Sequence, residues 1–526
     1  MVELAKPAPA RDATARPSWR ARAAARAWLQ IRAWPLTRKF LLVLCVVYLA
    51  KQALTVVIFP PFTGHDEVAH YAYVETVADE HRVPVLPDLT GWPPPNTEQP
   101  PPPPGDYIPD DLYRYCLYIL GWQGGNVCEP ANPWYAANPP HVVRYNKGVG
   151  FKPVGYQYAA THPPLYYLLM TPLSWLSNSA SAETRLFLFR FAAIPFGLLT
   201  VILSYLTVRA LFPRDAFLAI TVPAYVAFQP QISYEAAMLN NDILAIALFS
   251  WIIYLLVSGI RNRFPIRTCV LLGLAFGLAL LAKGTSLTAA PLIAVAMIFG
   301  IGIRNVRTWV TRGALVAGIA ALLSWPWYLH MYRTYGNFDA FEQLQALQWW
   351  NYWGRDKPTI WELFWNQEFA VWRWRETWGE FGWRRIHLSD GLLWGIAAPH
   401  AAAIVGLVVY GVMSVRSLMR RREAKGAGWS DFFGGRQAAT VGFLVVTLVV
   451  AYFAILQFGT QFELTQARYY FPAINALAMV TMVGLRTLLP ERWRRYGQAT
   501  IVAALVLLNL VIYSAYVIPY RLGGWV

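Results

Sequence analysis

Charged residues are scarce in this sequence. Only 14% of its 526 residues are Asp, Glu, Lys or Arg, whereas 56% are hydrophobic and the mean hydropathy is +0.34. This composition excludes a string of water-soluble domains and is typical of a polytopic membrane protein. The net charge is +16. In a membrane protein such an excess marks cytoplasmic loops, and because no nucleic-acid-binding motif accompanies it, we expect no nucleic acid partner.

Several familiar signals are also missing. No cleavable signal peptide precedes the first apolar run, so residues 1–38 are expected to form a basic cytoplasmic tail and the first span an uncleaved anchor. The zinc-protease pattern HExxH is absent, because His65 and His70 are five residues apart and Asp66 follows the first histidine. Glu67 and His70 still share one helical face, so incidental binding of a divalent metal ion by this pair stays open. No other cofactor is expected.

Long apolar runs dominate what is present. A membrane span takes about 20 mostly apolar residues. Eleven runs qualify, at 39–60, 186–210, 215–232, 242–259, 267–284, 286–303, 313–330, 391–415, 438–458, 469–488 and 498–519. A twelfth apolar stretch, 163–178, is short and is interrupted by Pro172. The sequence therefore predicts an all-α polytopic membrane protein with eleven spans, or twelve if this stretch also crosses.

The positions of the basic loops favour eleven spans. If 163–178 does not cross and the N-terminus is inside, nearly every short basic loop falls in the cytoplasm, as the positive-inside rule requires. We therefore expect 163–178 to be a re-entrant or interfacial helix. Two large segments, 61–185 and 331–390, then lie outside. The chain divides accordingly into the tail, a membrane module over 39–330, the second external segment 331–390, and C-terminal spans over 391–526.

Polar side chains gather at the outer ends of several spans. They are Asp66, Glu67, His162, Glu235, Asn240, Asp242, Lys283, Gln466, Arg468 and Tyr469. Ionisable groups at membrane depth are costly and need a partner or a function, so this set indicates one water-filled pocket.

Simpler interpretations of the same residues stay open. Asp66 and Asp242 are each suited to cap a helix. Lys283 is long enough to extend its ammonium group to the membrane surface, and Arg468 has Glu463 nearby in sequence. Lys51, near the middle of the first span, either extends to the surface or has a partner.

The second external segment is rich in tryptophan, with nine between residues 349 and 383. Indole rings settle at the level of lipid headgroups, so the segment is suited to lie at the membrane surface. A second interpretation is a platform for sugars or headgroups built from Trp378 and Trp383, with Arg373 and Arg375 available for phosphate. The two interpretations are compatible.

Cysteines are few, and two of the four lie in the first external segment. An oxidising exterior favours a disulfide between Cys116 and Cys128, whereas two free thiols are the alternative. Cys45 and Cys269 lie in spans and are expected to be packing residues.

The order and common side of these polar elements resemble the GT-C superfamily of integral membrane glycosyltransferases, which includes the protein mannosyltransferase and aminoarabinose transferase-like families. The matching elements are the acidic pair Asp66-Glu67 after the first span, the His162-Pro-Pro-Leu-Tyr-Tyr helix, the acidic turn with Asn240 and Asp242, Lys283, and the Gln-x-Arg-Tyr-x-x-Pro signature from Gln466 to Pro472. The resemblance covers most of the chain after the N-terminal tail.

The resemblance implies an enzyme that takes a sugar from a polyprenyl-phosphate carrier at the outer face of the plasma membrane and inverts the anomeric centre. The acceptor would be a glycan, a lipid or a protein. Asp66 would be the general base, with Glu67 beside it, and Lys283 and Arg468 would stabilise the departing phosphate. The other residues expected to bind substrate or lipid phosphate are His162, Glu235, Asp242, Gln466 and Tyr469.

One departure from the family pattern concerns His162, because many relatives have lysine at this position; phosphate contact here is expected to be weaker or pH-dependent. Two alternatives to an enzyme also remain open. The first is a transporter or flippase of a lipid-linked or amphipathic substrate, although no internal repeat is evident. The second is a non-catalytic assembly subunit that keeps the fold. In each case membrane lipids are expected partners.

Overall fold

The computed structural model of the protein describes residues 33–88, 90, 104–108, 112, 144–146, 150–152, 157–347, 356–382, 386–423, 431–463 and 465–522. The two cysteines of the predicted disulfide, Cys116 and Cys128, lie outside these residues, as do Trp383 and most of the predicted tail.

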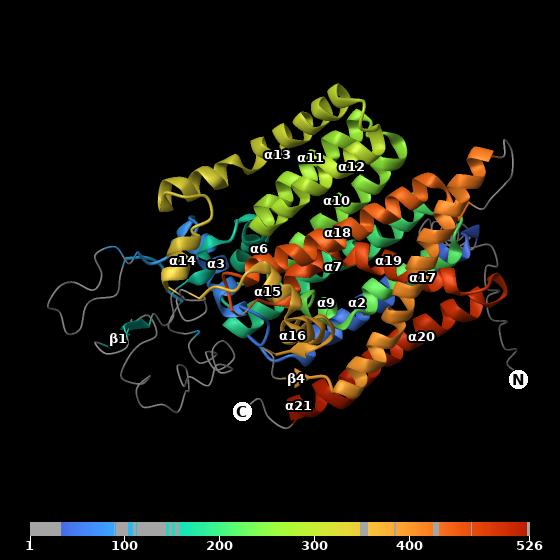
Figure 1. Ribbon diagram of the computed structural model, residues 1–526. Coiled ribbons are helices and arrows are strands. Elements are labelled where there is room, and N and C mark those ends of the chain that lie inside the picture. The colour runs from blue at the N-terminus through green and yellow to red at the C-terminus, as the bar shows by residue number, and fades with distance from the viewer. Residues whose placement is uncertain are drawn as a thin grey trace, which may run out of the picture.

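Long helices form a bundle (Figure 1). They are α2 (Leu36–Ile58), α7 (Ala182–Leu211), α8 (Ala216–Phe228), α10 (Asp242–Asn262), α11 (Ile266–Ala282), α12 (Ala289–Ile301), α13 (Val306–Tyr335), α17 (Asp390–Glu423), α18 (Gly435–Gly459), α19 (Ile474–Leu488) and α20 (Arg494–Ile512). Within the described ranges, nine helical stretches are long and apolar enough to cross a membrane, and α8 and α11 are shorter apolar helices. Each predicted span coincides with one of these, so the helical membrane fold is confirmed. The number of spans that cross stays a prediction.

Short elements connect the long helices. They are α3 (Glu67–Glu80), α6 (Leu165–Leu176), α9 (Pro230–Glu235), α14 (Phe341–Leu347), α15 (Ile360–Trp365), α16 (Gln367–Trp378), α21 (Ile518–Leu522), the 3₁₀ turns η3 (Tyr158–Thr161), η4 (Gly284–Thr288), η6 (Asp431–Phe433), η7 (Ala467–Ala473) and η8 (Glu491–Trp493), and the π-helical turn η9 (Tyr513–Val517). Strand β1 (Arg144–Asn146) pairs antiparallel with β2 (Gly150–Lys152), and β3 (Glu380–Phe381) pairs antiparallel with β4 (Ile386–His387).

Helix α6 corresponds to the apolar stretch at 163–178. It has 12 residues and Pro172 inside it. At 1.5 Å per residue it is about 18 Å long, too short for a hydrocarbon core of about 30 Å. Helices α3, α6 and α14 gather at one end of the bundle (Figure 1). The two segments predicted to be external therefore both carry short helices, as expected.

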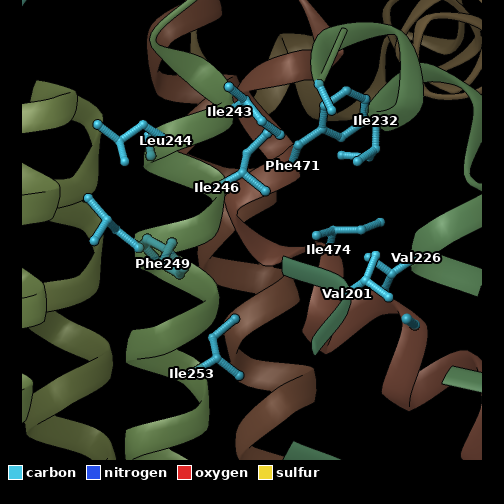
Figure 2. Close-up of a cluster of buried hydrophobic side chains, with 14 of the residues drawn as sticks. Val201, Val226, Ile232, Ile243, Leu244, Ile246, Phe249, Ile253, Phe471 and Ile474 are labelled. Atoms are coloured by element: carbon cyan, nitrogen blue, oxygen red, sulfur yellow. The ribbon is translucent and has the colours of Figure 1, made fainter. Parts of the chain in front are cut away.

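Helix α10 is the centre of the bundle. In its most apolar window 83% of the residues are buried, compared with 28% for α2 and 22% for α17. Its side chains Ile243, Ile246 and Ile253 belong to the same buried cluster as Val201 of α7, Val226 of α8 and Ile474 of α19 (Figure 2). The start of α10 is therefore held firmly, whereas α2 and α17 turn most of their surface outward.

A buried ion pair joins the centre of the bundle to the turn after α2. Arg190 of α7 and Glu67 of α3 are both 0% exposed, and two guanidinium nitrogens reach the two carboxylate oxygens at 2.8 and 2.5 Å. Arg190 also donates to the carbonyl oxygens of Val56, Phe59 and Pro60 at the C-terminal end of α2. These carbonyls have no partner within the helix, so the cation both caps α2 and holds α3.

The Glu67 carboxylate accepts further hydrogen bonds from the backbone. The N–H groups of Gly64 and Leu239 donate to it at 2.8 and 2.9 Å. A Cβ at position 64 would lie 2.5 Å from Cδ of Glu67, so the turn requires glycine there. The pair thus fixes the short connection that carries Asp66.

The topology can be tested with two exposed positions, Asn178 after α6 and Arg304 between α12 and α13. Each is replaced by cysteine in a background in which the four native cysteines are serine. In right-side-out membrane vesicles, an impermeant thiol reagent should label position 178 directly and position 304 only after permeabilisation. The reverse pattern would contradict the predicted orientation.

The ion pair can be tested with Arg190→Met, which leaves the Glu67 charge buried without its partner. We expect a loss of roughly 3–5 kcal/mol of stability, seen as a large drop in the thermal unfolding temperature in detergent. The control is Arg82→Met, because the Arg82 side chain is 43% exposed in its pair with Asp106. That change should cost about 0–1 kcal/mol. Equal unfolding temperatures for the two variants would show that the buried pair is not a main constraint.

Candidate functional site

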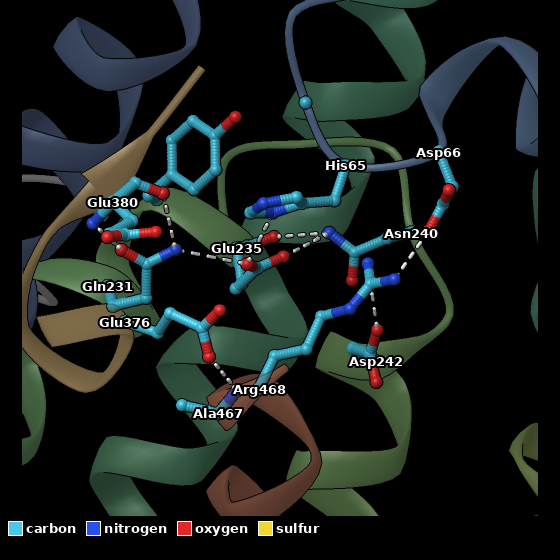
Figure 3. A network of polar contacts seen from close by, with 12 residues as sticks. His65, Asp66, Gln231, Glu235, Asn240, Asp242, Glu376, Glu380, Ala467 and Arg468 are labelled. Carbon is cyan, nitrogen blue, oxygen red and sulfur yellow. Dashed lines mark hydrogen bonds and ion pairs between the residues drawn. The ribbon is translucent and has the colours of Figure 1, made fainter. Parts of the chain in front are cut away.

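Asp66 occupies the turn between α2 and α3. Its backbone is left-handed, with φ 59°, a conformation that costs a residue other than glycine about 1–3 kcal/mol and is common at functional sites. The side chain makes no capping hydrogen bond to α3. Instead Oδ1 accepts from the Tyr158 hydroxyl at 3.0 Å and Oδ2 from Nη2 of Arg468 at 2.5 Å. The carboxylate therefore faces the other polar groups rather than its own helix (Figure 3).

Two acids and two cations alternate around this position. Nη1 of Arg468 lies 3.6 Å from Oδ2 of Asp242, and the Lys283 ammonium bonds to the other oxygen of Asp242. The Tyr469 ring lies beneath both cations, with its centroid 5.0 Å from the Lys283 nitrogen and 5.6 Å from the Arg468 guanidinium carbon. Asp66, Asp242, Lys283, Arg468 and Tyr469 thus form one cluster, here called the ionic cluster. Lys283 and Arg468 are therefore both buried and do not extend to the membrane surface. The ion-pair partners of Arg468 are Asp66 and Asp242 and not Glu463.

Four separate segments build the ionic cluster. Asp66 follows α2, Asp242 begins α10, Lys283 ends α11, and Arg468 lies in η7 before α19. Because these four positions meet, the corresponding ends of α2, α10, α11 and α19 lie at the same end of the bundle.

The ionic cluster keeps Asp66 in its charged form. Burial opposes ionisation of this carboxyl group, but the charge of Arg468 beside it more than offsets that effect, and the pKa of Asp66 lies well below its usual range. An ionised carboxylate is able to accept a proton, although a low pKa makes it a weak base while Arg468 is bound to it.

Two histidines lie beside the ionic cluster as neutral rings. Burial lowers the pKa of His70 to about 4 and that of His162 to about 3. The rings stack with centroids 5.7 Å apart, and Nδ1 of His70 lies 2.8 Å from the Tyr167 hydroxyl. His162 therefore brings no positive charge to the site at neutral pH.

A cavity lies on another side of Arg468. It is small, with room for about one water molecule, and is lined by His65, Gln231, Glu235, Glu376, Glu380, Gln466, Ala467 and Arg468. Nδ1 of His65 contacts Oε1 of Glu235 at 3.0 Å, and Oε2 of Glu376 accepts from the Ala467 N–H at 2.8 Å. Two residues predicted to bind substrate, Glu235 and Gln466, line this cavity rather than the ionic cluster. Glu235 lies between His65 and Gln231 (Figure 3).

The predicted tryptophan platform is wrong for Trp378. This side chain is only 1% exposed and packs against Tyr225 and His400, so its ring faces the protein core and has no free face for a sugar. The two arginines expected there are also engaged, Arg373 with Glu376 and Arg375 with Asp390. The periodicity of a tryptophan-rich amphipathic segment does not reveal which indole faces inward.

The Glu67 and His70 side chains have separate partners. Glu67 is fully enclosed by Arg190 and backbone N–H groups, whereas His70 bonds to Tyr167. Among the described residues no group of three or more His, Cys, Asp or Glu side chains is arranged to hold a metal ion. Because Glu67 is 0% exposed, its position suits a residue that supports Asp66 and does not contact substrate.

Several contributing residues were not predicted. Arg190 is an ionisable residue inside an apolar run, which is a signal that sequence reasoning can use. Glu376 and Glu380 lie in the tryptophan-rich second external segment, and nothing in its composition indicates that these two acids belong to the site. Tyr158 carries no signal in the sequence. Lys51, for which two interpretations were open, has partners: it donates to the Ala227 carbonyl and the Ser233 hydroxyl.

Comparisons with known proteins give a partial match. The profile of the family described as dolichyl-phosphate-mannose-protein mannosyltransferase matches residues 161–329, about a third of the chain. No curated protein matches the sequence. The structure is similar to the archaeal oligosaccharyltransferase AglB from Archaeoglobus fulgidus in complex with an inhibitory peptide and a dolichol-phosphate. The TM-score is 0.51 at 12% identity, covering 91% of this chain and 56% of that one.

The structure is also similar to ArnT from Cupriavidus metallidurans bound to undecaprenyl phosphate, with a TM-score of 0.48 and 15% identity over 90% of this chain and 65% of that one. The chain thus spans less than two thirds of the length of either structure. At such identities the likeness to AglB shows the fold alone. The expected fold is confirmed at that level: the protein is a multi-pass membrane protein that shares the helical fold of AglB.

Proposed function

We propose that the protein is a membrane glycosyltransferase that moves a sugar from a polyprenyl-phosphate-linked donor to an acceptor, with inversion of the anomeric centre. The observation that supports this most is the ionic cluster, in which the partly exposed carboxylate of Asp66 directly contacts the cation Arg468. An inverting transfer needs one base and a means of stabilising the departing phosphate, and it needs no nucleophile from the protein. The ionic cluster contains both.

The cations act on the leaving group. As the bond between the anomeric carbon and the phosphate oxygen breaks, the phosphate gains one negative charge. Arg468 and Lys283 are placed to bind that charge, and their attraction grows as the bond breaks, which lowers the barrier. In the free protein Asp66 and Asp242 occupy the same cations. Bound phosphate would therefore compete with these two carboxylates.

This competition also prepares the base. When Arg468 turns toward phosphate, Asp66 loses its strongest stabilising charge and becomes more basic. Asp66 then accepts the proton of the acceptor hydroxyl or amide as the acceptor atom bonds to the anomeric carbon. The Tyr158 hydroxyl, 3.0 Å from Oδ1, keeps the carboxylate oriented during this step.

The proposed location follows the distribution of basic residues. The N-terminus and the basic loops lie in the cytoplasm, and the ionic cluster lies at the external face of the plasma membrane. The membrane module is proposed to span 39–330, with 331–390 as the second external segment and 391–526 as C-terminal spans. The acceptor is a glycan, a lipid or a protein at that face.

The role of the base is tested with Asp66→Asn, which keeps the shape and removes the basicity. Sugar transfer from a lipid carrier should fall by roughly 10²–10⁴, the usual effect of losing a general base, while carrier binding persists. Asp390→Asn is the control, because Asp390 forms an exposed pair with Arg375 away from the ionic cluster. Normal transfer by a folded Asp66→Asn protein would remove Asp66 from the mechanism.

The phosphate site is tested with Lys283→Ala and Arg468→Ala. Each change removes a charge-assisted contact, so the affinity for undecaprenyl phosphate should fall about 10- to 100-fold. Thermal unfolding of each variant shows whether the loss is local. Arg375→Ala serves as the matched control and should leave the affinity unchanged. Full affinity in both test variants, with a loss in Arg375→Ala, would place the phosphate at the second external segment instead.

A further inference from the structure

We propose that Glu376 of the second external segment is a positioning residue, which fixes the turn from which Arg468 reaches the phosphate. The inference rests on the proposed function, because it concerns a cation that is proposed to bind the leaving group. Glu376 is 5% exposed, and its Oε2 accepts at 2.8 Å from the N–H of Ala467, the residue before Arg468 (Figure 3). Glu376 and Ala467 are 91 residues apart in the sequence, so two distant segments meet at this contact.

The hydrogen bond from Ala467 caps the start of η7. The first N–H groups of a helical turn have no carbonyl partner within it, and the side chain of the preceding residue often accepts from them. Gln466 has that position before η7, but its side chain makes no capping hydrogen bond. The Glu376 carboxylate accepts instead, and its negative charge suits the positive end of the backbone dipoles. The backbone of Arg468 is therefore held by a side chain from another segment.

Glu376 is itself held in place. Arg373, one turn earlier on α16, binds both carboxylate oxygens, with Nε 2.8 Å from Oε2 and Nη2 3.1 Å from Oε1. Beyond α16, the side-chain amide of Gln231 on α9 accepts from the Glu380 N–H at 3.1 Å and donates to the Glu380 carbonyl at 3.3 Å. Residues on both sides of the turn after α16 are thus fixed, so Glu376 is a firm point of attachment for η7.

The same segment also contacts the turn that carries Asp66. The Gly382 N–H donates to the Tyr234 hydroxyl at 3.1 Å, and this hydroxyl donates to the Thr63 carbonyl at 2.5 Å. Thr63 lies three residues before Asp66. Residues 376–382 are therefore connected to the backbone turns of both Asp66 and Arg468. A cation held in advance at the right place loses less conformational entropy when phosphate binds, which favours affinity.

The test measures the affinity of the full-length protein for undecaprenyl phosphate in detergent. Glu376→Met and Glu376→Gln both remove the charge and keep the length, but only glutamine retains an oxygen that accepts from Ala467. The methionine variant should bind about 3- to 10-fold more weakly, as expected for loss of one helix cap, and the glutamine variant should stay within about twofold of wild type. Glu368→Met is a further control with unchanged affinity, because Glu368 is exposed on the same helix.

Both Glu376 variants leave Arg373 without its carboxylate partner. If that loss unfolds the protein, the same comparison is made in an Arg373→Met background, because apolar replacement of both members of a buried ion pair is usually tolerated. The difference between methionine and glutamine at position 376 should persist there. Thermal unfolding of every variant shows that folded proteins are compared.

Double variants distinguish positioning from a general loss of structure. If Glu376 acts through Arg468, Glu376→Met should weaken binding no further in an Arg468→Ala background. The full effect of Glu376→Met should remain in a Lys283→Ala background, because Arg468 is still present there.

Three results would overturn this inference alone: unchanged affinity in Glu376→Met, an equal loss in Glu376→Gln, or a loss that persists in the Arg468→Ala background. The proposed function would stand in all three, because it depends on Arg468 and Lys283 themselves. Full affinity in both Arg468→Ala and Lys283→Ala would instead contradict the proposed phosphate site and this inference with it.

Discussion

A pair of charges that cannot reach water, Arg190 and Glu67, sets the geometry on which the rest of this structure depends. Removing two ions from water costs several kcal/mol each, and only good geometry with further hydrogen bonds compensates that loss. Here the guanidinium binds the carboxylate through two nitrogens and also caps the carbonyl end of α2, while backbone N–H groups complete the shell of Glu67. The pair therefore joins α2, α3, α7 and the turn before α10 in one arrangement. The left-handed backbone of Asp66 is held within it.

The ionic cluster follows a different principle. Its charges lie at the end of the bundle, and the Asp66 side chain is 16% exposed, so these ion pairs are open to exchange. In the proposed mechanism a phosphate takes the places of two carboxylates, and the free protein keeps its cations occupied until the donor arrives. The contrast with the Arg190 pair is physical: one pair is enclosed on all sides, while the other has a cavity next to it. The rigid support and the exchangeable charge thus come from two consecutive residues, Glu67 and Asp66.

Much of the fold could be predicted because its signals are local. A run of about 20 apolar residues predicts a span without knowledge of its neighbours. The short, proline-interrupted stretch at 163–178 was distinguished from a span by the charges of distant loops, and it forms the 12-residue helix α6. The contacts between charged side chains could not be predicted in this way, because partners such as Asp66 and Arg468 are 402 residues apart in the sequence. The position of Trp378 was predicted wrongly. The tryptophan-rich composition of its segment suggested an exposed ring, whereas the ring is buried against His400.

The exchange of partners at Arg468 is the centre of this account, and a structure determined with bound undecaprenyl phosphate tests it most directly. The account predicts a phosphate between Arg468 and Lys283, with the Arg468–Asp66 contact broken and the Arg190–Glu67 pair unchanged. A phosphate bound elsewhere, or one bound beside Arg468 while its contact with Asp66 stays intact, would contradict it.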